Sequence, residues 1–418
     1  MSTQKIAIVG SGISGLTAAY LLNKEHKVTV FEASDYIGGH THTVPVTLDG
    51  KSFKVDTGFI VCNNRNYPSF LKFMNKLNVN IQPTEMSFSV RNNAMNLEFN
   101  GHNLSTLFSQ RRNFFRPSFY SLVRQILRFN KVSKRVIDQG NITDITLDEF
   151  VDQHKFSAVF RDNYLLPMVA AIWSCSVEQA GKFPLEFFLK FFHNHGLLDI
   201  KNRPQWYVLK GGSSSYIEPM TADFSDQIRL NTPVCAVMRT GEQVQVQTDK
   251  GIEEFDQVIM ACHSDQALSL LQRPSSKEES ILGAMGYQNN DVVLHNDESI
   301  MPRKALSWAS WNFLTGEESI NQPPLVTYCM NILQGLNSSS PLLVSLNARH
   351  KIDPQKILQE FSYSHPVFSK ESMVAQQRRR EICGTDRIHY CGAYWYSGFH
   401  EDGVRSALDV CERFGLEL

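Results

Sequence analysis

The pattern of apolar positions opens with a short strand that runs directly into a glycine-rich turn. Residues 5–9 form an apolar run that ends at glycine, and apolar positions with helical spacing continue from there to Leu22. A second apolar run covers 28–32. Strand, helix and strand in this order predict a β-α-β unit, in which the helix connects two parallel strands.

Later segments alternate between strand and helix periodicity, with turn residues between them. The elements expected in chain order are a helix at 66–77, strands at 87–90 and 95–99, a helical region at 146–192, strands at 243–247 and 255–261 that return as a hairpin to the first domain, polar loops at 275–280 and 336–340, and a strand, glycine-rich loop and helix at 390–414.

These elements predict the fold class α/β, with a Rossmann-like domain assembled from discontinuous segments and an inserted α+β substrate domain. The chain has 418 residues, more than the roughly 100–200 of a typical domain, which agrees with more than one core. We expect the dinucleotide-binding domain to comprise 1–85, 200–265 and 385–418. The substrate domain is expected to comprise 86–199 and 266–384.

The first turn carries a dinucleotide-binding motif, Gly10-Ser11-Gly12-Ile13-Ser14-Gly15. Gly10 permits the tight turn, Gly12 lets the backbone approach a pyrophosphate, and Gly15 allows close helix–strand packing. The free N–H groups of the helix N-terminus point at the phosphates. Glu32 ends the second strand about 20 residues later, where its carboxylate can bind a ribose hydroxyl. Strand, helix and acid together predict a dinucleotide site rather than a chance glycine loop.

Further glycine turns favour FAD over a nicotinamide dinucleotide. Gly38-Gly39 and Asp56-Thr57-Gly58 are tight polar turns that let the chain pass an extended cofactor again. Residues 398–403 open the last helix. A helix N-terminus under the flavin would stabilise the anionic reduced cofactor, although the acids at 401–402 also suit the dipole of an ordinary helix.

Composition narrows the class and the location. The formal net charge is -1, which gives no argument for nucleic acid as a partner. None of the 8 cysteines forms a C-x-x-C pair, so we expect no metal site and reduced thiols. The N-terminus does not show a secretory signal, and no apolar run is long enough to cross a bilayer. The expected location is the cytoplasm, and no oligomeric state is predicted.

Longer motifs give the chain a family likeness. The sequence resembles the FAD-dependent amine-oxidase/phytoene-desaturase superfamily, and within it the bacterial NAD/FAD-binding flavoproteins. The likeness spans nearly the whole chain, and the motifs that carry it are 10–15, 32–40, 167–174, 194–197, 211–213, 308–312, 391–395 and 398–403.

The resemblance implies that Glu32 binds the adenosine ribose and that the second glycine turn lines the pyrophosphate. It implies contacts from Val234 on the adenine side, from the end of the returning strand, and from the last motif at the flavin. The cofactor-binding residues expected are Gly10, Ser11, Gly12, Ile13, Ser14, Gly15, Glu32, Ala33, Gly38, Gly39, His40, Thr41, Thr57, Gly58, Val234, Ala261, Cys262, Gly392, Trp395, Phe399, His400, Glu401, Gly403 and Val404.

Two positions depart from the pattern of the superfamily. Many members have arginine after the paired glycines, where this chain has His40, so a permanent positive charge is missing there. Many also have an acid in the last motif where Ala393 stands. The ribityl or phosphate contact is then left to backbone groups or to another side chain.

Hydride transfer to a flavin needs positioning and exclusion of water more than acid–base groups, so we expect an aromatic cavity rather than a triad. Trp395 and Tyr396 are the first candidates to face the isoalloxazine ring; the alternative is that they are core aromatics. His400 is expected beside the flavin, whereas other histidines, such as His195, are more often structural. Trp173, Trp308 and Trp311 are weaker candidates for the site.

A basic and aromatic segment is the other notable feature. It contains Arg111, Arg124 and Arg135 among eight cations, and no acidic residue occurs from Phe99 to Ile137. Apolar positions recur at three- and four-residue steps, as on one helical face. The segment 111–135 is expected either to pack on its own domain or to lie on anionic lipid at the inner membrane face. Nucleic-acid binding is disfavoured because no matching module is present.

The predicted function is FAD-dependent dehydrogenation of an apolar organic substrate by hydride transfer to the flavin. An acyl chain or lipid is the first substrate candidate. It is suggested by the basic helix and by the resemblance, since such flavoproteins tend to be encoded near cyclopropane-fatty-acid synthase-like methyltransferases. The alternatives are a flavin amine oxidase, a flavin-dependent isomerase without net redox change, and a non-catalytic flavin-binding membrane adaptor.

Overall fold

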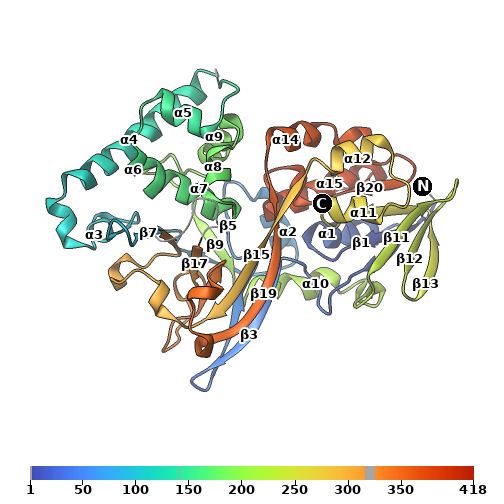
Figure 1. Cartoon of the computed structure of the whole chain (residues 1–418). Helices are drawn as coiled ribbons and strands as arrows, with labels where there is room; N and C mark the ends of the chain where they lie inside the picture. The colour runs from blue at the N-terminus through green and yellow to red at the C-terminus, as the bar shows by residue number, and fades with distance from the viewer. Residues whose placement is uncertain (1, 141, 316–324) are drawn as a thin grey trace.

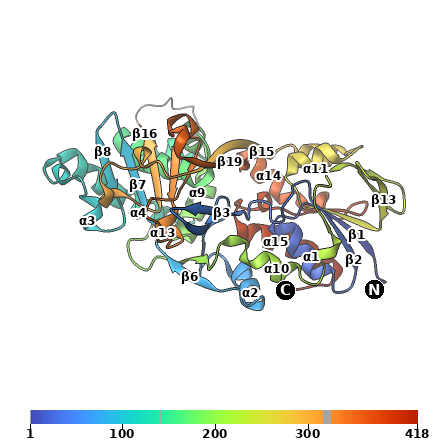
Figure 2. The same cartoon turned by 90° about the horizontal axis from the view of Figure 1, so that it is seen from below.

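A parallel sheet and a largely antiparallel sheet form the two ends of the chain's fold. The structure is a computed structural model that describes residues 2–140, 142–315 and 325–418. Figures 1 and 2 show the N-terminal sheet at one end of the molecule and helices α3 and α4 at the other. The expected substrate segment 266–384 includes 316–324, which lies outside the described residues.

The first sheet has five parallel strands in the order β10-β2-β1-β14-β20. Because β1 and β2 pair in parallel through the crossover helix α1, the expected β-α-β unit is confirmed. The strands and the two helices packed together on this sheet are β1 (Lys5–Val9), α1 (Ile13–Leu22), β2 (Lys27–Phe31), β10 (Ile228–Arg229), β14 (Gln257–Met260), β20 (Ile388–Tyr390) and α15 (His400–Cys411).

The expected hairpin at 243–261 is corrected in one respect. β12 (Val244–Thr248) and β13 (Gly251–Phe255) form the hairpin with β11 (Val234–Arg239), but the parallel strand β14 starts separately after Asp256. Asp256 breaks the run because its Oδ2 accepts from Lys5 N–H at 2.7 Å and its own N–H donates to the Lys5 carbonyl at 2.8 Å. The polar pair Asp256-Gln257 inside the segment 255–261 marks this turn.

The second sheet has seven strands in the order β19-β15-β18-β17-β16-β7-β8. All neighbours pair antiparallel except β16 and β7, which are parallel. In Figure 1 the long antiparallel pair of β15 and β19 runs between the two ends of the molecule. The strands are β7 (Phe88–Asn92), β8 (Leu97–Asn100), β15 (Gly286–His295), β16 (Trp311–Thr315), β17 (Leu325–Cys329), β18 (Leu343–Leu346) and β19 (Ile357–Val367).

Helices cover one face of this sheet and share its aromatic core. The expected helical region at 146–192 is confirmed as a series of short helices, with a π-helical turn at Arg161–Leu165 just before Pro167. The helices of this end are α3 (Leu104–Leu107), a 3-10 turn η1 (Arg111–Phe115), α4 (Pro117–Asp138), α5 (Leu147–Gln153), α6 (Ala158–Phe160), α7 (Leu166–Trp173), α8 (Val177–Gly181) and α9 (Leu185–Asn194).

Small elements lie between the two ends. The expected helix at 66–77 is confirmed as α2. The elements are β3 (Thr43–Leu48) paired with β4 (Lys51–Asp56), β9 (Trp206–Leu209) between β5 (Cys62–Asn63) and β6 (Ile81–Thr84), the helices α2 (Pro68–Lys76), α10 (Ile217–Thr221) and α13 (Met330–Leu333), and the 3-10 turn η3 (Ser213–Tyr216).

Three helices that fall largely within the expected substrate segment 266–384 pack instead with the first sheet. α11 (Ser264–Leu270), α12 (Ser276–Leu282) and α14 (Lys370–Gln377) contribute buried residues such as Ala267, Ile281 and Ala375 to its core. Periodicity identifies an element but not the core that receives it. We therefore propose that 266–285 and 370–384 belong to the dinucleotide-binding domain rather than to the substrate domain.

The expected polar loop at 275–280 is wrong, because α12 begins there. Ser275 Oγ accepts from Glu278 N–H at 3.3 Å, and the Glu278 carboxylate accepts from Ser275 N–H at 2.8 Å. This reciprocal capping box satisfies two backbone donors at the helix start. The S-x-x-E spacing of Ser275 and Glu278 is present in the sequence, but the polar and charged residues around it favoured a loop.

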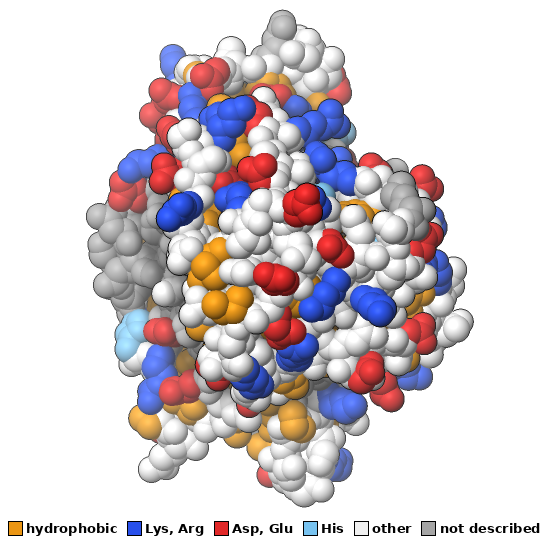
Figure 3. Space-filling view, turned by 90° about the vertical axis from the view of Figure 1, so that its right-hand side faces the viewer, with side chains coloured by type: hydrophobic (Ala, Val, Ile, Leu, Met, Phe, Trp, Pro, Cys, Tyr) orange, Lys and Arg blue, Asp and Glu red, His pale blue; other side chains and the backbone are white. Residues whose placement is uncertain are grey.

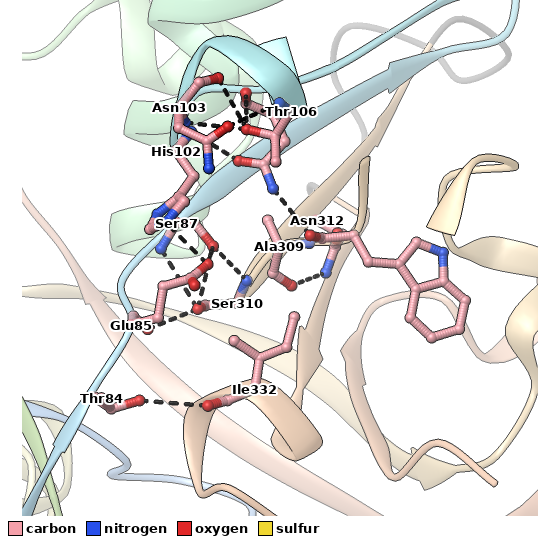
Figure 4. A network of polar contacts seen from close by, with 12 residues as sticks. Thr84, Glu85, Ser87, His102, Asn103, Thr106, Ala309, Ser310, Asn312 and Ile332 are labelled. Atoms are coloured by element: carbon pink, nitrogen blue, oxygen red, sulfur yellow. Dashed lines mark hydrogen bonds and ion pairs between the residues drawn. The ribbon is translucent and has the colours of Figure 1, made fainter. Parts of the chain in front are cut away.

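A buried polar network fixes the 308–312 motif to the neighbouring strand (Figure 4). Ser310 N–H donates to Ser87 Oγ at 3.0 Å, and Ser310 Oγ donates to the Glu85 carbonyl at 2.7 Å. The Asn312 amide donates to the Ala309 carbonyl at 2.7 Å and its oxygen accepts from Ala309 N–H at 2.9 Å. Every polar group of Asn312 is thus used in holding the chain.

The surface around the first sheet mixes charges of both signs, as Figure 3 shows for that end of the molecule. Among the described residues, no helix combines the length and the apolar character that crossing a bilayer requires.

Candidate functional site

The turn between β1 and α1 has the tight geometry that a phosphate-binding loop requires. A Cβ atom on Gly15 would lie 2.0 Å from the Gly10 carbonyl oxygen, whereas one on Gly12 would meet no atom within 4 Å. No described residue accepts a hydrogen bond from the backbone N–H groups of 13–15. Gly12 therefore faces open space beside a free helix N-terminus, where an anionic phosphate is stabilised.

Glu32 reaches from the end of β2 to this turn. Its Oε2 accepts from the Ser11 backbone N–H at 2.8 Å and from Ser11 Oγ at 2.6 Å, and its Oε1 accepts from Ser34 N–H at 2.8 Å. The fixed carboxylate stands where a dinucleotide ribose would be bound. Ala33 beside it is exposed, and Val234 on the neighbouring segment is half-buried.

The second glycine turn lies against the first. Gly38 and Gly12 form an isolated parallel bridge, and a Cβ on Gly39 would lie 3.2 Å from the Gly12 Cα. Both Gly38 and Gly39 have positive φ, 128° and 57°, which favours glycine. The structure therefore brings these two expected glycine turns into direct contact.

Ala261 and Cys262 form the other side of the first turn. Ala261 N–H donates to the Val9 carbonyl at 2.9 Å, and its carbonyl oxygen would lie 3.0 Å from a Cβ on Gly10. Burial raises the pKa of the Cys262 thiol to about 12, so the thiol stays protonated.

The N-terminus of α15 meets that of α1. A Cβ on Gly403 would lie 2.6 Å from Ile13 Cγ2 and 3.0 Å from Ser14 Oγ, so glycine lets the two helices touch at their first turns. Beside Gly403, Val404 is fully buried. The backbone N–H groups of 400–401 have no acceptor among the described residues. Two helix N-termini with unpaired donors therefore lie side by side, which suits a cofactor that carries negative charge at two places.

His400 belongs to a buried group that joins α15 to the second glycine turn. Its Nε2 lies 3.0 Å from Tyr216 Oη, which lies 2.5 Å from Thr41 Oγ1. Its ring stacks on Phe59 at 3.7 Å. Burial lowers the pKa of His400 to about 3, so the imidazole is neutral at ordinary pH.

His40 carries an unpaired donor or acceptor in the same region. Its buried Nε2 has no hydrogen-bond partner among the described residues, and the rings of His263 and His365 lie 5.8 and 5.5 Å away. Burial first, and the neighbouring His263 second, lower the pKa of His40 to about 4. The unpaired nitrogen, the space before Gly12 and the two helix ends together fit a dinucleotide.

Thr57 and Gly58 support the second glycine turn. A Cβ on Gly58 would lie 2.2 Å from the His40 carbonyl oxygen, and Thr57 N–H donates to the His42 carbonyl at 3.0 Å. Thr57 Oγ1 also lies 2.9 Å from Tyr363 Oη on β19. Both residues therefore support the second glycine turn through the backbone of 40–42.

Trp395 and Tyr396 lie apart from this cluster. The Trp395 ring is buried in the core of the first sheet, with the Arg379 guanidinium 5.3 Å from its centre. Tyr396 Oη donates to Asp409 at 2.6 Å, and Arg405 lies over its ring at 4.1 Å. This placement favours the alternative reading of core aromatics, and a flavin contact for either residue stays a prediction.

Glu401 and Gly392 have structural partners. The Glu401 carboxylate accepts from Ser69 N–H at 3.0 Å and Phe70 N–H at 2.8 Å, so it caps the start of α2. Burial raises its pKa against these hydrogen bonds. Gly392 N–H donates to Ser406 Oγ at 2.8 Å, which ties the end of β20 to α15.

Phe399 is the aromatic residue of the last motif that meets the other end of the molecule. Its ring stacks on Phe191 of α9 at 4.9 Å, and Phe191 stacks on His195 at 3.8 Å. The Trp173 ring lies 4.5 Å from Phe191. Phe399, as the residue just before α15, thus connects the helix N-terminus to an aromatic cluster of α7 and α9.

Trp308 and Trp311 lie on the far sheet. Trp308 Nε1 donates to the Pro302 carbonyl at 2.8 Å, and Trp311 packs edge-on against Tyr328 at 5.0 Å. The Phe399 ring contacts the rings of Phe191 and His195, and not those of Trp308 or Trp311. Among the described residues, no group of His, Cys, Asp and Glu side chains could hold a metal ion.

Comparison with known proteins supplies the family. The sequence profile of flavin-containing amine oxidoreductases matches residues 13–361, well over half of the chain. The chain belongs to this family. The expected superfamily and flavin cofactor are confirmed at that level, and the residues around Gly12 and His40 are those of this chain that fit FAD.

Individual relatives are distant. A Mycobacterium tuberculosis protein whose assigned name is flavin-containing monoamine oxidase AofH is 24% identical over 277 residues. The alignment covers 62% of this chain and only 57% of that relative. The cofactor expectation therefore comes from the family, whereas the reaction must be argued from the site.

Solved structures establish the fold of this family member. A CLA-producing fatty acid isomerase from P. acnes aligns with a TM-score of 0.71 at 14% identity, covering 98% of each chain. Cyclohexylamine oxidase from Brevibacterium oxydans aligns with a TM-score of 0.69 at 13% identity, covering 99% of this chain and 100% of that one. The expected α/β fold class is confirmed.

Sequence reasoning missed some residues at the centre of this flavoprotein's site. Phe59 and Tyr216 contact His400, and Phe191 contacts Phe399, yet none was a candidate. A signal was present for Phe191 because it lies just before the 194–197 motif. Phe59 directly follows Gly58, but an apolar residue in a turn gives no sign of what it contacts.

Proposed function

We propose that this flavoprotein dehydrogenates a C–C or C–N bond of an apolar organic substrate, in which a hydride leaves a C–H bond for the flavin and the hydrogen on the neighbouring atom leaves as a proton. The observation that carries the proposal is the contact between α1 and α15 at Gly403, which sets two helix N-termini beside Phe399 and the aromatic side chains of α9. A bound FAD would supply the hydride acceptor. The protein's own groups then have to bind, orient and keep water out.

The residues present can perform those tasks. Free N–H groups at the start of α1 and α15 stabilise negative charge without changing protonation state. Phe191, Phe399 and Trp173 form a rigid apolar surface that excludes water and orients a substrate C–H bond. His400 adds no charge because it is neutral and is held by Tyr216.

An acyl chain or lipid is the first proposed substrate. The rings that contact Phe399 belong to Phe191 and His195, and burial lowers the pKa of His195 to about 4, so this cluster carries no charge at neutral pH. An apolar chain satisfies such a surface, whereas an ammonium group gains most from a nearby carboxylate. The fold likeness to a fatty acid isomerase is compatible with this choice.

An amine substrate is the second candidate. The family name and the fold likeness to cyclohexylamine oxidase support it, and aromatic faces also attract cations. A flavin-dependent isomerase and a non-catalytic membrane adaptor stay open as further alternatives. We propose a cytoplasmic location with a peripheral contact at the inner membrane face through 111–135.

An anaerobic titration separates these candidates. Purified protein loaded with FAD is mixed without oxygen with an unsaturated fatty acid, host lipid extract or cyclohexylamine, and the visible flavin absorption is recorded. Bleaching by the first two supports the proposal, and bleaching by the amine alone contradicts the acyl substrate. A shifted double bond without net bleaching indicates an isomerase. No bleaching and no product with any of them favours the adaptor.

Two variants sharpen the titration. Phe191→Leu should slow bleaching at least about tenfold, because the substrate loses an oriented surface. Phe150→Leu removes a buried ring from the same domain that contacts Phe129 rather than Phe399. It should leave bleaching unchanged, and equal slowing in both variants would mean that only stability was affected.

A further inference from the structure

The end of the molecule farthest from the parallel sheet exposes large apolar side chains. Phe115 is 88% exposed, Leu104 77%, Tyr120 49% and Leu127 46%. With Phe114, they are five of the eleven exposed large hydrophobic residues in the described chain, so they form a cluster rather than a scatter. Exposed apolar clusters of this kind mark interaction surfaces. We call the exposed side chains of 104–135 the basic–aromatic surface.

Positive charge surrounds these apolar side chains. Between Phe99 and Ile137 there are eight cations and no acidic residue. In the described part of the chain, Arg111, Arg124 and Lys131 have neither an ion pair nor a hydrogen-bonded side-chain partner. Lysines on α8 and α9, in contrast, pair with glutamates one turn away, as Lys190 does with Glu186 at 2.6 Å. Unpaired cations such as Lys27 and Lys210 also occur elsewhere in the described chain, but between Phe99 and Ile137 the cations stand beside exposed apolar side chains with no acidic residue among them.

The exposed face of α4 combines both properties along one line. Tyr120, Arg124, Leu127 and Lys131 follow one another at three- and four-residue steps and are exposed, while Phe129 on the opposite face is buried. A hollow of about 530 Å³ lies at the start of this line, lined by Phe114, Phe115, Pro117, Tyr120, Ser121 and Arg124. Aromatic rings with a guanidinium among them suit an acyl chain whose headgroup is anionic.

The geometry points to an anionic lipid bilayer as the occupant, and we propose that the basic–aromatic surface docks on it. Figures 1 and 2 both place α3 and α4 at the extreme end of the molecule, so a flat surface can reach them without meeting the first sheet. Protruding rings insert at the headgroup boundary and cations bind anionic lipid. A nucleic acid would satisfy the charge but would leave Leu104 and Leu127 exposed. This inference sharpens the proposed membrane contact and is independent of the proposed chemistry.

The test is vesicle flotation with the full FAD-loaded chain. Vesicles of phosphatidylcholine with about 30% phosphatidylglycerol are compared with phosphatidylcholine alone, at low and at physiological salt. We expect binding to the anionic vesicles that weakens with salt. Absence of binding to anionic vesicles at both salt concentrations would overturn the inference.

Matched triple variants identify the surface. Arg111→Glu, Arg124→Glu and Lys131→Glu together should lower vesicle binding at least about a hundredfold, since each cation near an anionic surface contributes about fivefold and reversal also adds repulsion. Lys27→Glu, Lys51→Glu and Lys210→Glu change the net charge equally at exposed positions outside the surface. Equal loss in both triples would show general attraction by net charge and would overturn the proposed surface.

Ring insertion has its own readout. Phe115→Trp should show a blue-shifted emission when anionic vesicles are added, because the indole leaves water. Phe115→Ser should lower binding by about tenfold or more. Val374→Ser removes a side chain that is 57% exposed on α14 and should have no effect. Binding without a blue shift and without an effect of Phe115→Ser would contradict insertion. In that case an excess of RNA that displaced the vesicles would point to a nucleic-acid surface instead.

Discussion

The two ends of this molecule use their side chains in opposite ways. Around Gly12 the chain has glycines, whose missing side chains let two helix ends with free backbone N–H groups come close to each other and to a cofactor. Around Phe115 and Arg124 the chain extends side chains outward, and little lies within reach of them. Close approach of backbone tolerates almost no substitution, whereas an exposed surface depends on the sum of many weak contributions. Substitutions should therefore act singly and strongly at the first end, and collectively at the second.

The largest effect is expected at Gly15. A methyl group there would lie 2.0 Å from the Gly10 carbonyl oxygen and 3.2 Å from Ala261 Cβ, so β1 and α1 must separate. Gly15→Ala should lower the free energy of unfolding by about 3 kcal/mol or more and abolish FAD binding. Chemical denaturation and the visible spectrum measure both. A stable, yellow Gly15→Ala protein would contradict the packing described for α1.

Gly12→Ala separates cofactor binding from stability. Its methyl group would meet nothing within 4 Å, and Gly12 has a φ of -64° that alanine adopts readily. We expect stability to change by less than about 1 kcal/mol, and FAD affinity to fall at least about tenfold because the pyrophosphate loses its close approach. Gly101→Ala, near the second sheet and also uncrowded, is the control. Unchanged FAD affinity in Gly12→Ala would mean that the cofactor does not lie in front of this turn.

Two arginines compare the ends directly. Arg379 is buried and donates to the carbonyls of Tyr390 and Ser406 and to Asp409, whereas Arg124 is exposed without such partners. Arg379→Met should cost about 3 kcal/mol, because it leaves carbonyls and a carboxylate unpaired. Arg124→Met should cost less than about 0.5 kcal/mol. Similar losses of stability in both variants would contradict the claim that Arg379 is buried and paired whereas Arg124 is exposed.

The histidines near the second glycine turn should make the first end sensitive to acid. Burial lowers the pKa values of His40 and His263 to about 4 and of His365 to about 3, so the unfolded chain, with pKa values near 6.5, binds protons first as pH falls. The free energy of unfolding is therefore unaffected by these histidines above pH 6.5, and it falls as the pH is lowered from about 6.5 toward 4. Asp56, whose pKa burial raises to about 6, acts in the opposite direction.

The difference between wild type and a variant isolates this contribution. In a His40→Gln, His263→Gln, His365→Gln protein, the loss of stability between pH 7 and pH 5 should be smaller by about 2 kcal/mol for each histidine removed, or about 5 kcal/mol in all. Vesicle binding through arginines and lysines should stay constant over the same range. An identical pH dependence of unfolding in wild type and variant would show that these histidines are not buried in the neutral form.

The same contrast explains what the sequence could foretell. The β-α-β unit, Glu32 and the glycine turns were predictable because each depends on contacts of the backbone, which only certain residues permit. The direction of a side chain after an irregular turn was not. Phe399, rather than Trp395, meets the aromatic cluster because the chain turns at Ala393–Trp395 and again at Gly398, which has a φ of 89°.

Packing between residues far apart in the chain was a second feature that could not be predicted from the sequence. A polar loop was expected at 275–280 and no helix at 264–270, and the sequence pattern could not show that helices at these positions pack on the first sheet. Phe59 and Tyr216 were equally hidden, since each becomes part of the candidate site through His400, far away in the chain. An apolar or hydroxyl side chain has the same local signature in a core and in a site.

The most direct test of this account is the identity and amount of cofactor in the purified chain. Visible absorption is recorded first, and the cofactor released by denaturation is then identified by chromatography and mass. We predict a yellow protein with one FAD per chain, and a Gly12→Ala protein that is folded but largely colourless. A colourless wild-type protein that FAD cannot reconstitute would contradict the central claim that the joined N-termini of α1 and α15 hold this cofactor.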